Sequence, residues 1–300
     1  MLRKKIALFG AGIWGQNILR ELTGLGVDTD VFDTNNEIKS AAIRLGASAF
    51  AGRCDDPSKY DGIIISTPSS THRNLVYSLA GSGVPIFLEK PLTLSKEDAD
   101  DIKKLSPDHL YMMHIWLYHP GIQRLAEIAK SEALGKVLAI RSTRANWTSP
   151  RTDSDSAWNL LPHDLTITKA ILGKIPEPKY AVSEYHDGVI RGMTAILGNQ
   201  PHCIFEVSNR YERKIREVRL HCQEGVAVLE NEKVDYITIV RGDDTSSLSM
   251  EKEHFDSTPP LRLELMEFLR FLEGGPPPRS TFEDGLEVVN AIHQLRAISH

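Results

Sequence analysis

The chain has 300 residues, of which 41% are hydrophobic and 25% charged, and its formal net charge is −5 at pH 7. These values are typical of a soluble globular protein of about two domains, and they exclude the basic footprint of nucleic-acid or acidic-membrane binding. No apolar run approaches the roughly 18 residues of a membrane span, no secretory pattern precedes the first strand, and three scattered cysteines suggest neither disulfides nor a metal site. We therefore expect a cytoplasmic protein with no metal, membrane or nucleic-acid partner.

The first expected strand and helix flank a glycine-rich turn. Residues 4–9 form a short apolar run, and Gly10–Gly15 then reads G-x-G-x-x-G before a segment with helical spacing of apolar residues. This context is what a dinucleotide fingerprint requires, because the glycines allow a tight turn, approach of a pyrophosphate and close helix packing. The helix N-terminus then attracts the phosphates. The expected cofactor contacts in this turn are Gly10, Gly12, Ile13, Trp14 and Gly15, although ordinary helix packing would also account for Trp14.

The second expected strand, Val27–Phe32, ends at Asp33, which lies 23 residues after Gly10. An acidic side chain about 20 residues after the glycine turn accepts hydrogen bonds from the ribose 2′-hydroxyl. It would repel a 2′-phosphate, and no arginine occupies the next three positions. The pattern favours NAD over NADP, whereas an ordinary solvated aspartate is the structural alternative.

Strands and helices continue to alternate as far as residue 115, which predicts a parallel sheet with right-handed crossovers. Ligands of such sheets bind outside the carboxyl ends of the strands, so the loops Ser66–His72 and Glu89–Pro91 are expected beside the glycine turn. The expected elements are a helix over Asn36–Leu45, a weak strand over Ala47–Phe50, a strand over Gly62–Ile65, a helix over Thr71–Ala80, a strand over Val84–Leu88, a helix capped by Ser95 and ending near Leu105, and a strand over His109–His114.

The alternation of predicted strands and helices stops in the second half of the chain. Strands separated by turns, with no helices between them, run from Tyr180 to about Ile239 and predict a mainly antiparallel sheet. We therefore expect an α/β Rossmann domain over residues 1–118, and an α+β domain over 119–300 whose open, mainly antiparallel sheet serves substrate binding and oligomerisation. The last helix could pack on either domain. The other expected elements are helices over Pro120–Ser131, Leu160–Leu172, Leu261–Leu272 and Phe282–Ile298, a strand over Lys136–Ser142 and a polar loop over Asn146–Ser156.

Four motifs together resemble the Gfo/Idh/MocA oxidoreductases, a family that pairs a Rossmann domain with a C-terminal α/β domain. The resemblance covers nearly the whole chain and implies NAD(P)-dependent oxidation of a CH–OH group, in a homo-oligomer such as a dimer or tetramer. Tyr118–Pro120 and Leu134–Lys136 are similar to the sugar-nucleotide 3-dehydrogenase branch. The four motifs are Gly10–Gly15, Thr67-Pro68 with Thr71-His72, Glu89-Lys90-Pro91, and Trp158–Asp164.

Lys90 is the candidate acid–base residue. Hydride transfer from an alcohol carbon needs the hydroxyl proton removed, and a lysine of lowered pKa takes that proton or binds the alkoxide. The resemblance implies this role for Lys90, in contact with cofactor and substrate, although a single strand-end lysine is usually solvated. Glu89 either orients Lys90 or binds the nicotinamide ribose, and both readings stay open. The resemblance also places Thr67, Pro68 and His72 along the cofactor, whereas His72 could simply belong to the first turn of its helix.

His163 follows Pro162 near the expected start of a helix and could act as a base or anchor a sugar hydroxyl. Family members carry an aspartate four residues earlier, which completes a Lys-Asp-His group, and here that position is Asn159. An asparagine positions a substrate but carries no charge or proton. Either Lys90 and His163 suffice for proton transfer, or the chemistry is impaired. Asp164 is expected to be a favourable charge near the helix N-terminus.

Arg144 and Asn146 lie on one face of an extended segment. A cation there suits an anionic substrate such as a uronate or a sugar nucleotide, and a solvated loop is the alternative. The sequence as a whole predicts an NAD-dependent oxidoreductase acting on a secondary alcohol of a sugar, sugar nucleotide or cyclitol. Two alternatives remain: an NAD-dependent glycoside-cleaving enzyme of the same fold, and a non-catalytic dinucleotide-binding regulatory protein, which Asn159 favours.

Overall fold

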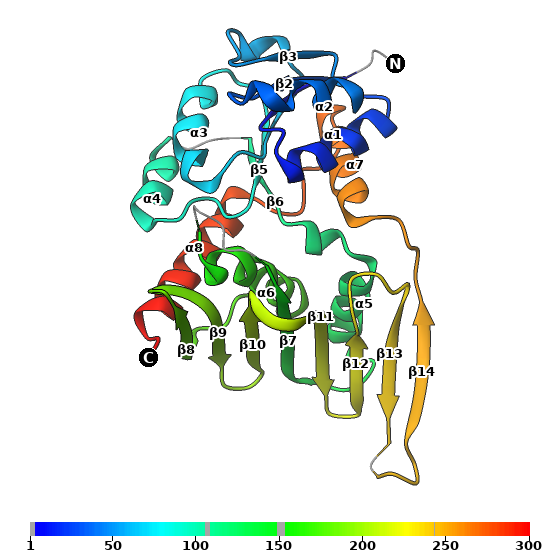
Figure 1. Cartoon of the computed structure of the whole chain (residues 1–300). Coiled ribbons are helices and arrows are strands. Elements are labelled where there is room, and N and C mark those ends of the chain that lie inside the picture. The colour runs from blue at the N-terminus through cyan, green and yellow to red at the C-terminus, as the bar shows by residue number, and fades with distance from the viewer. Residues whose placement is uncertain (1–3, 106–108, 149–153, 243) are drawn as a thin grey trace. The chain divides into compact units, whose positions relative to one another are not determined.

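The computed structural model describes residues 4–105, 109–148, 154–242 and 244–300 (Figure 1). The chain forms two compact units. Unit 1 is Met1–His114 with Leu261–Val289, and unit 2 is Ile115–Pro260 with Asn290–His300. The division therefore differs from the expected boundary after residue 118, because a C-terminal segment returns to the first unit and the last helix is shared by both.

Unit 1 is built on a six-stranded parallel sheet with the order β3-β2-β1-β4-β5-β6. Strands β4 and β5 are buried along their whole length, as expected of apolar strands covered on both faces. The order reverses between β1 and β4, and a crevice for ligands lies outside the carboxyl ends of strands at such a point. The predicted Rossmann fold is confirmed. The strands are β1 Lys5–Phe9, β2 Asp28–Phe32, β3 Ala49–Ala51, β4 Gly62–Ile65, β5 Ile86–Glu89 and β6 Leu110–Met113.

The helices of unit 1 follow the predicted ones closely, except that the segment over 36–45 is a short 3-10 turn and a brief helix. Helix α7 packs on the sheet through Phe268, whose ring lies 4.7 Å from that of Phe87 in β5. The helices are α1 Ile13–Gly24, α2 Lys39–Arg44, α3 His72–Ala80, α4 Lys96–Lys104 and α7 Pro260–Leu272, and α8 Phe282–Ala297 begins in unit 1 and ends in unit 2. The 3-10 turns are η1 Asn36–Ile38, η2 Pro57–Lys59 and η3 Ser69–Thr71.

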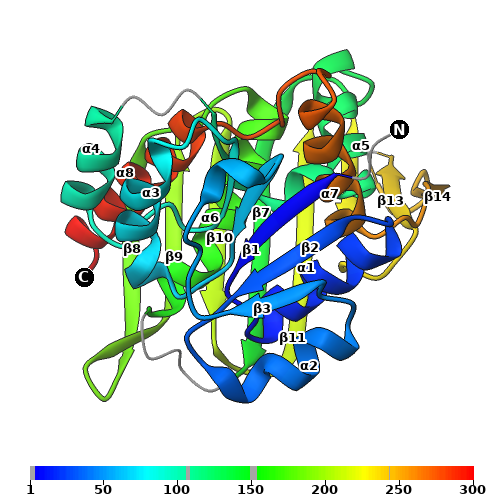
Figure 2. The same cartoon turned by 90° about the horizontal axis from the view of Figure 1, so that it is seen from above.

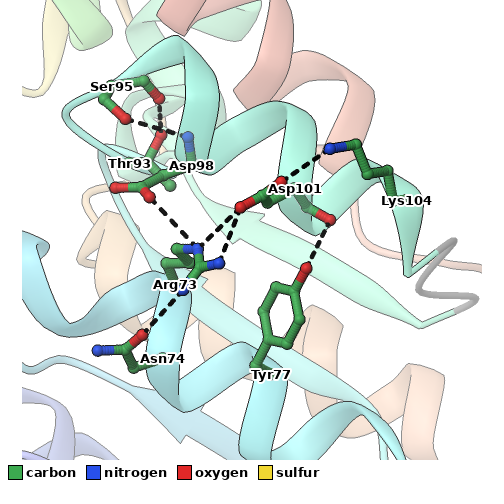
Figure 3. A network of polar contacts seen from close by, with 8 residues as sticks. All are labelled: Arg73, Asn74, Tyr77, Thr93, Ser95, Asp98, Asp101 and Lys104. Carbon is green, nitrogen blue, oxygen red and sulfur yellow. Dashed lines mark hydrogen bonds and ion pairs between the residues drawn. The ribbon is translucent and has the colours of Figure 1, made fainter.

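Helices α3 and α4 lie side by side (Figure 2) and are joined by polar contacts. The hydroxyl of Ser95 accepts the Asp98 N–H at 3.0 Å, so the predicted cap of α4 is confirmed. Arg73 of α3 pairs with Asp101 at 2.8 Å and with Asp98 at 3.3 Å (Figure 3). Surface pairs of this kind contribute about 1 kcal/mol or less, so they orient α4 on α3 more than they stabilise the fold.

Unit 2 contains an open eight-stranded sheet with the order β14-β13-β12-β11-β7-β10-β9-β8. Its pairs are antiparallel except β7 with β10, so the predicted mainly antiparallel sheet is confirmed. Strand β7 runs on to Trp147, which makes Arg144 and Asn146 strand residues and shortens the expected loop, of which residues 149–153 lie outside the described part. The strands are β7 Val137–Trp147, β8 Pro178–His186, β9 Val189–Gly198, β10 His202–Ser208, β11 Arg210–Cys222, β12 Gly225–Leu229, β13 Tyr236–Arg241 and β14 Ser249–His254.

Helix α6, Ser156–Leu172, begins four residues before the predicted start at Leu160. Asp155 caps it by accepting the Trp158 N–H at 3.1 Å, and Pro162 lies inside the helix, where it lacks the N–H of an ordinary helical residue. The prediction that His163 and Asp164 lie at the helix start is therefore wrong, since the proline does not mark the first turn. The remaining helical segments are η4 Ile115–Tyr118 and α5 Pro120–Ser131, as predicted for α5. None of the described helices is long and apolar enough to cross a membrane.

Glu264 of α7 is a buried acid inside unit 1. Its side chain is 0% exposed, and neither carboxyl oxygen has a hydrogen-bond partner among the described residues. Burial, followed by the charges of Glu89 and Glu267, raises the pKa of Glu264 well above its ordinary value. The side chain therefore keeps its proton at a pH where the same group in the unfolded chain has lost it.

We expect Glu264→Leu to stabilise the protein by about 1–3 kcal/mol near neutral pH, the usual cost of an unsatisfied buried polar group. Because the folded pKa is the higher one, the unfolded wild-type chain releases a proton above about pH 4.5, and stability falls by up to about 1.4 kcal/mol per pH unit as pH rises toward the folded pKa. Urea unfolding at pH 5 and pH 8 should show this fall in the wild type and in the exposed control Glu273→Leu, but not in Glu264→Leu. The same pH dependence of the free energy of unfolding in all three proteins would contradict the assignment of this fall to Glu264.

Candidate active site

The glycine turn at the carboxyl end of β1 is closely packed on one side and open on another. Gly10 has φ +85°, and a Cβ there would lie 2.8 Å from the Thr67 nitrogen. A Cβ on Gly15 would lie 2.1 Å from the Gly10 carbonyl oxygen, so only glycine allows α1 to approach the strand. A Cβ on Gly12 would meet nothing within 4 Å. The open side at Gly12, the N-cap of α1, fits the predicted approach of a pyrophosphate.

Asp33 ties the second strand to this turn. One of its carboxylate oxygens accepts the Ala11 N–H and the other accepts the Asn35 N–H, each at 2.8 Å. A carboxylate offers about four lone-pair sites, so acceptor capacity remains for ribose hydroxyls. The position of Asp33 beside the glycine turn is what its predicted role in NAD binding requires.

Glu89 joins the start of α1 to the end of β5. The indole N–H of Trp14 donates to Glu89 Oε1, and the backbone N–H of Lys90 donates to Glu89 Oε2 at 3.1 Å. Ile13, which is also among the predicted cofactor contacts of the glycine turn, is 89% exposed. Two roles were considered for Glu89. The bond from the Lys90 backbone N–H is a direct contact that supports the first of them, orientation of Lys90.

His72 joins the loops that follow β4 and β5. Its ring is 1% exposed, with Nδ1 2.9 Å from the Pro91 carbonyl oxygen and Nε2 3.1 Å from the Thr67 carbonyl oxygen. Carbonyl oxygens only accept, so both bonds form together only when both ring nitrogens carry hydrogen. These contacts hold the Thr67 loop and the cis Lys90–Pro91 turn against each other. Contact of His72, Thr67 and Pro68 with the cofactor stays a prediction.

Arg144 of unit 2, predicted as a substrate-binding cation, is buried within the unit. Its guanidinium lies over the Trp116 ring at 4.3 Å and donates to both carboxylate oxygens of Asp164, from Nε at 3.1 Å. The Ser142 hydroxyl adds a bond of 2.6 Å to the same carboxylate. Arg144 and Asp164 are 1% and 0% exposed, so their charges balance inside the fold. Asp164 is therefore a buried ion-pair partner rather than a helix-terminal charge.

Asn159 and His163 lie one turn apart on α6, in unit 2, and residues four apart share a helix face. Asn159 exchanges hydrogen bonds with Ser154, accepting from its hydroxyl at 3.0 Å and donating to its carbonyl at 3.3 Å. Lys90 belongs to unit 1. The grouping of Lys90 with Asn159 and His163 therefore stays a prediction.

The sequence of this chain is similar to those of a known enzyme family. Residues 4–114 match the sequence model of the Gfo/Idh/MocA oxidoreductases, described as an oxidoreductase family with an NAD-binding Rossmann fold. The UDP-N-acetylglucosamine 3-dehydrogenase of Acidithiobacillus ferrooxidans is 29% identical over 187 residues, which are 61% of this chain and 58% of that protein. The 2,7-anhydro-N-acetylneuraminate hydratase of Mediterraneibacter gnavus is 22% identical over 57% of this chain and 50% of its own. The alignments thus span 58% and 50% of the length of these two relatives.

Solved structures match along nearly the whole chain. A structure of the same UDP-N-acetylglucosamine 3-dehydrogenase has a TM-score of 0.85 at 24% identity and covers 100% of this chain and 98% of its own. A levoglucosan dehydrogenase in complex with NADH and levoglucosan has a TM-score of 0.86 at 16% identity, covering 98% and 96%. At these identities the likeness establishes the two-unit fold.

Proposed function

We propose that this chain, whose residues 4–114 match the sequence model of the Gfo/Idh/MocA oxidoreductases, oxidises a secondary alcohol of a sugar, sugar nucleotide or cyclitol by hydride transfer to NAD. The observation that carries the proposal is the chain of contacts at the carboxyl ends of the strands. Asp33 holds the glycine turn, and Trp14 joins that turn to Glu89, which in turn binds the backbone of Lys90. A dinucleotide lying on the turn would therefore have Lys90 at the same edge of the sheet.

NAD, when bound, supplies a hydride acceptor at nicotinamide C4. Lys90 takes the proton of the substrate hydroxyl, and the bonds of Glu89 and His72 to the Lys90–Pro91 backbone hold that lysine in place. His163 assists the proton transfer and Asn159 orients the substrate. Asp33 selects NAD, because its carboxylate accepts from a 2′-hydroxyl and repels a 2′-phosphate.

A sugar nucleotide is the preferred substrate class within this proposal. The support is the UDP-N-acetylglucosamine 3-dehydrogenase, which resembles this chain in sequence and, across its whole length, in structure. Inositol 2-dehydrogenase of Leifsonia xyli, 26% identical over 51% of this chain, keeps cyclitols in the panel of substrates to be tested.

The test is absorbance at 340 nm with NAD or NADP and a panel of sugar nucleotides, inositols and free sugars, after assay of the purified protein for bound dinucleotide. We expect NADH to appear with one member of the panel, and less reduction with NADP. Failure to bind either dinucleotide would overturn the proposal at its first step.

A second candidate keeps the fold but produces no net NADH. Two of the relatives, from Mediterraneibacter gnavus and Escherichia coli, are named hydratases rather than dehydrogenases. An enzyme of this kind, like the glycoside-cleaving alternative, would use the hydride step transiently and regenerate NAD. Substrate consumed without a change at 340 nm would identify it, whereas bound NAD with no turnover of any compound would favour the regulatory alternative.

A further inference from the structure

Arg216 of β11 is a cation that the sequence did not single out. It lies opposite Arg144 in the register of β7 and β11. Its Nη1 donates to the carbonyl oxygens of Ala145 at 2.8 Å and Ile215 at 2.6 Å, and its Nη2 donates to Asn146 Oδ1 at 2.9 Å. The half-buried guanidinium is thus fixed in one geometry. Three of the five N–H donors of an arginine are used in this way, and two remain for a ligand.

The charges around Arg216 do not balance. Asp164 pairs directly with Arg144, and Glu232 pairs directly with Lys214. Both carboxylates also attract Arg216, but without a direct ion pair. Within the described part of the chain, no carboxylate lies within ion-pair distance of Arg216. His119 adds no further positive charge, since burial lowers its pKa. Three cations thus face two carboxylates, and the group keeps one net positive charge.

Burial and the neighbouring Arg144 lower the pKa of Arg216 to about 10, which still leaves it charged at neutral pH. Taking a charged group out of water without a partner costs several kcal/mol. A tether between β7 and β11 would need only a neutral donor such as glutamine. A charged arginine at this position is explained when an anionic ligand pairs with it.

We propose that Arg216, supported by Asn146, binds an anionic group of the substrate, either a phosphate or a carboxylate. Both anions accept from a guanidinium through two oxygens, which is why arginine recognises either one. The inference rests on the proposed function, because it takes unit 2 to be where the substrate binds. Arg216 replaces Arg144 as the recognition cation, and Asn146 keeps its predicted place through the bond to Arg216.

The test compares Arg216→Gln and Arg216→Lys with Arg219→Gln, an exposed arginine of the same strand that pairs with Glu217. Binding of UDP, glucuronate and neutral myo-inositol is measured by calorimetry on the full chain with NAD, and circular dichroism checks that each variant is folded. We expect Arg216→Gln to weaken binding of at least one anion about 10-fold or more, Arg216→Lys to weaken it less, and Arg219→Gln to leave it unchanged. NAD affinity should not change in any of them.

The probe whose binding is weakened in Arg216→Gln identifies the anion. Weaker binding of UDP alone indicates a phosphate, and weaker binding of glucuronate alone indicates a carboxylate. Wild-type affinity for both anions in Arg216→Gln, or no binding of either anion by the wild type, would overturn the inference. A wild type that oxidises a neutral sugar but binds neither anion would refute the inference and leave the proposed function standing. Anion binding that depends on Arg216, without NADH formation from any substrate, would support the inference and refute the proposed function.

Discussion

Replacing Lys90 with methionine is expected to cut turnover by about 10²-fold or more while NAD affinity stays close to that of the wild type. The size of the effect is that of a general acid–base contribution. Methionine fills a similar volume but cannot accept or donate the hydroxyl proton. The turnover number is measured at 340 nm with the substrate found in the panel, and NAD affinity by calorimetric titration. Lys104→Met, which removes an exposed lysine that pairs with Asp101, is the matched control.

NAD affinity should survive because the bond from the Lys90 backbone to Glu89 does not involve the lysine side chain. The bonds of His72 to the Thr67 and Pro91 carbonyls are also untouched. Unchanged turnover in Lys90→Met would remove Lys90 from the mechanism. Loss of NAD binding with the fold intact would instead make Lys90 a cofactor-binding residue.

Asp164→Ala should destabilise the protein by about 3–5 kcal/mol, the typical result of removing one partner of a buried ion pair. The variant would leave the Arg144 guanidinium, 1% exposed, without its carboxylate. It would also remove the acceptor of the Ser142 hydroxyl. The free energy of unfolding is measured by urea denaturation monitored by circular dichroism.

Asp101→Ala is the control for this experiment, since Asp101 pairs with Arg73 and Lys104 on the surface of unit 1 (Figure 3). Exposed pairs contribute about 1 kcal/mol or less, so the two variants should differ several-fold in their effect. Equal losses would mean that the pair between Arg144 and Asp164 is not a buried structural element. Arg144 would then return as a candidate for substrate binding.

The elements of unit 1 could be predicted from the sequence because their signals are local. Apolar runs mark β4 and β5, Ser95 and Asp98 mark the start of α4, and the glycine turn marks the end of β1. Each signal is contained within a few residues and needs no knowledge of the rest of the chain. The closeness of Asp33 to the glycine turn followed from the spacing of one motif.

The parts that were missed depend on contacts between distant residues. The pairing of Arg144 with Asp164 joins a strand to a helix, and Arg216 lies beside Asn146 only through the register of β7 and β11. The predicted helix began at Leu160, which placed His163 near its start, but α6 begins at Ser156 and continues through Pro162. Strand β14 was missed because all its residues but Met250 are polar and almost all are exposed, so no alternating pattern marks it.

In the proposed reaction a hydride passes from a carbinol carbon of the substrate to the nicotinamide of NAD. This transfer is tested most directly with substrate deuterated at that carbon, followed by mass spectrometry of the NADH formed by the wild-type protein. We expect one deuterium in each NADH molecule, and a slower rate but the same label in Lys90→Met. Oxidised product that forms without label in the nicotinamide would contradict it.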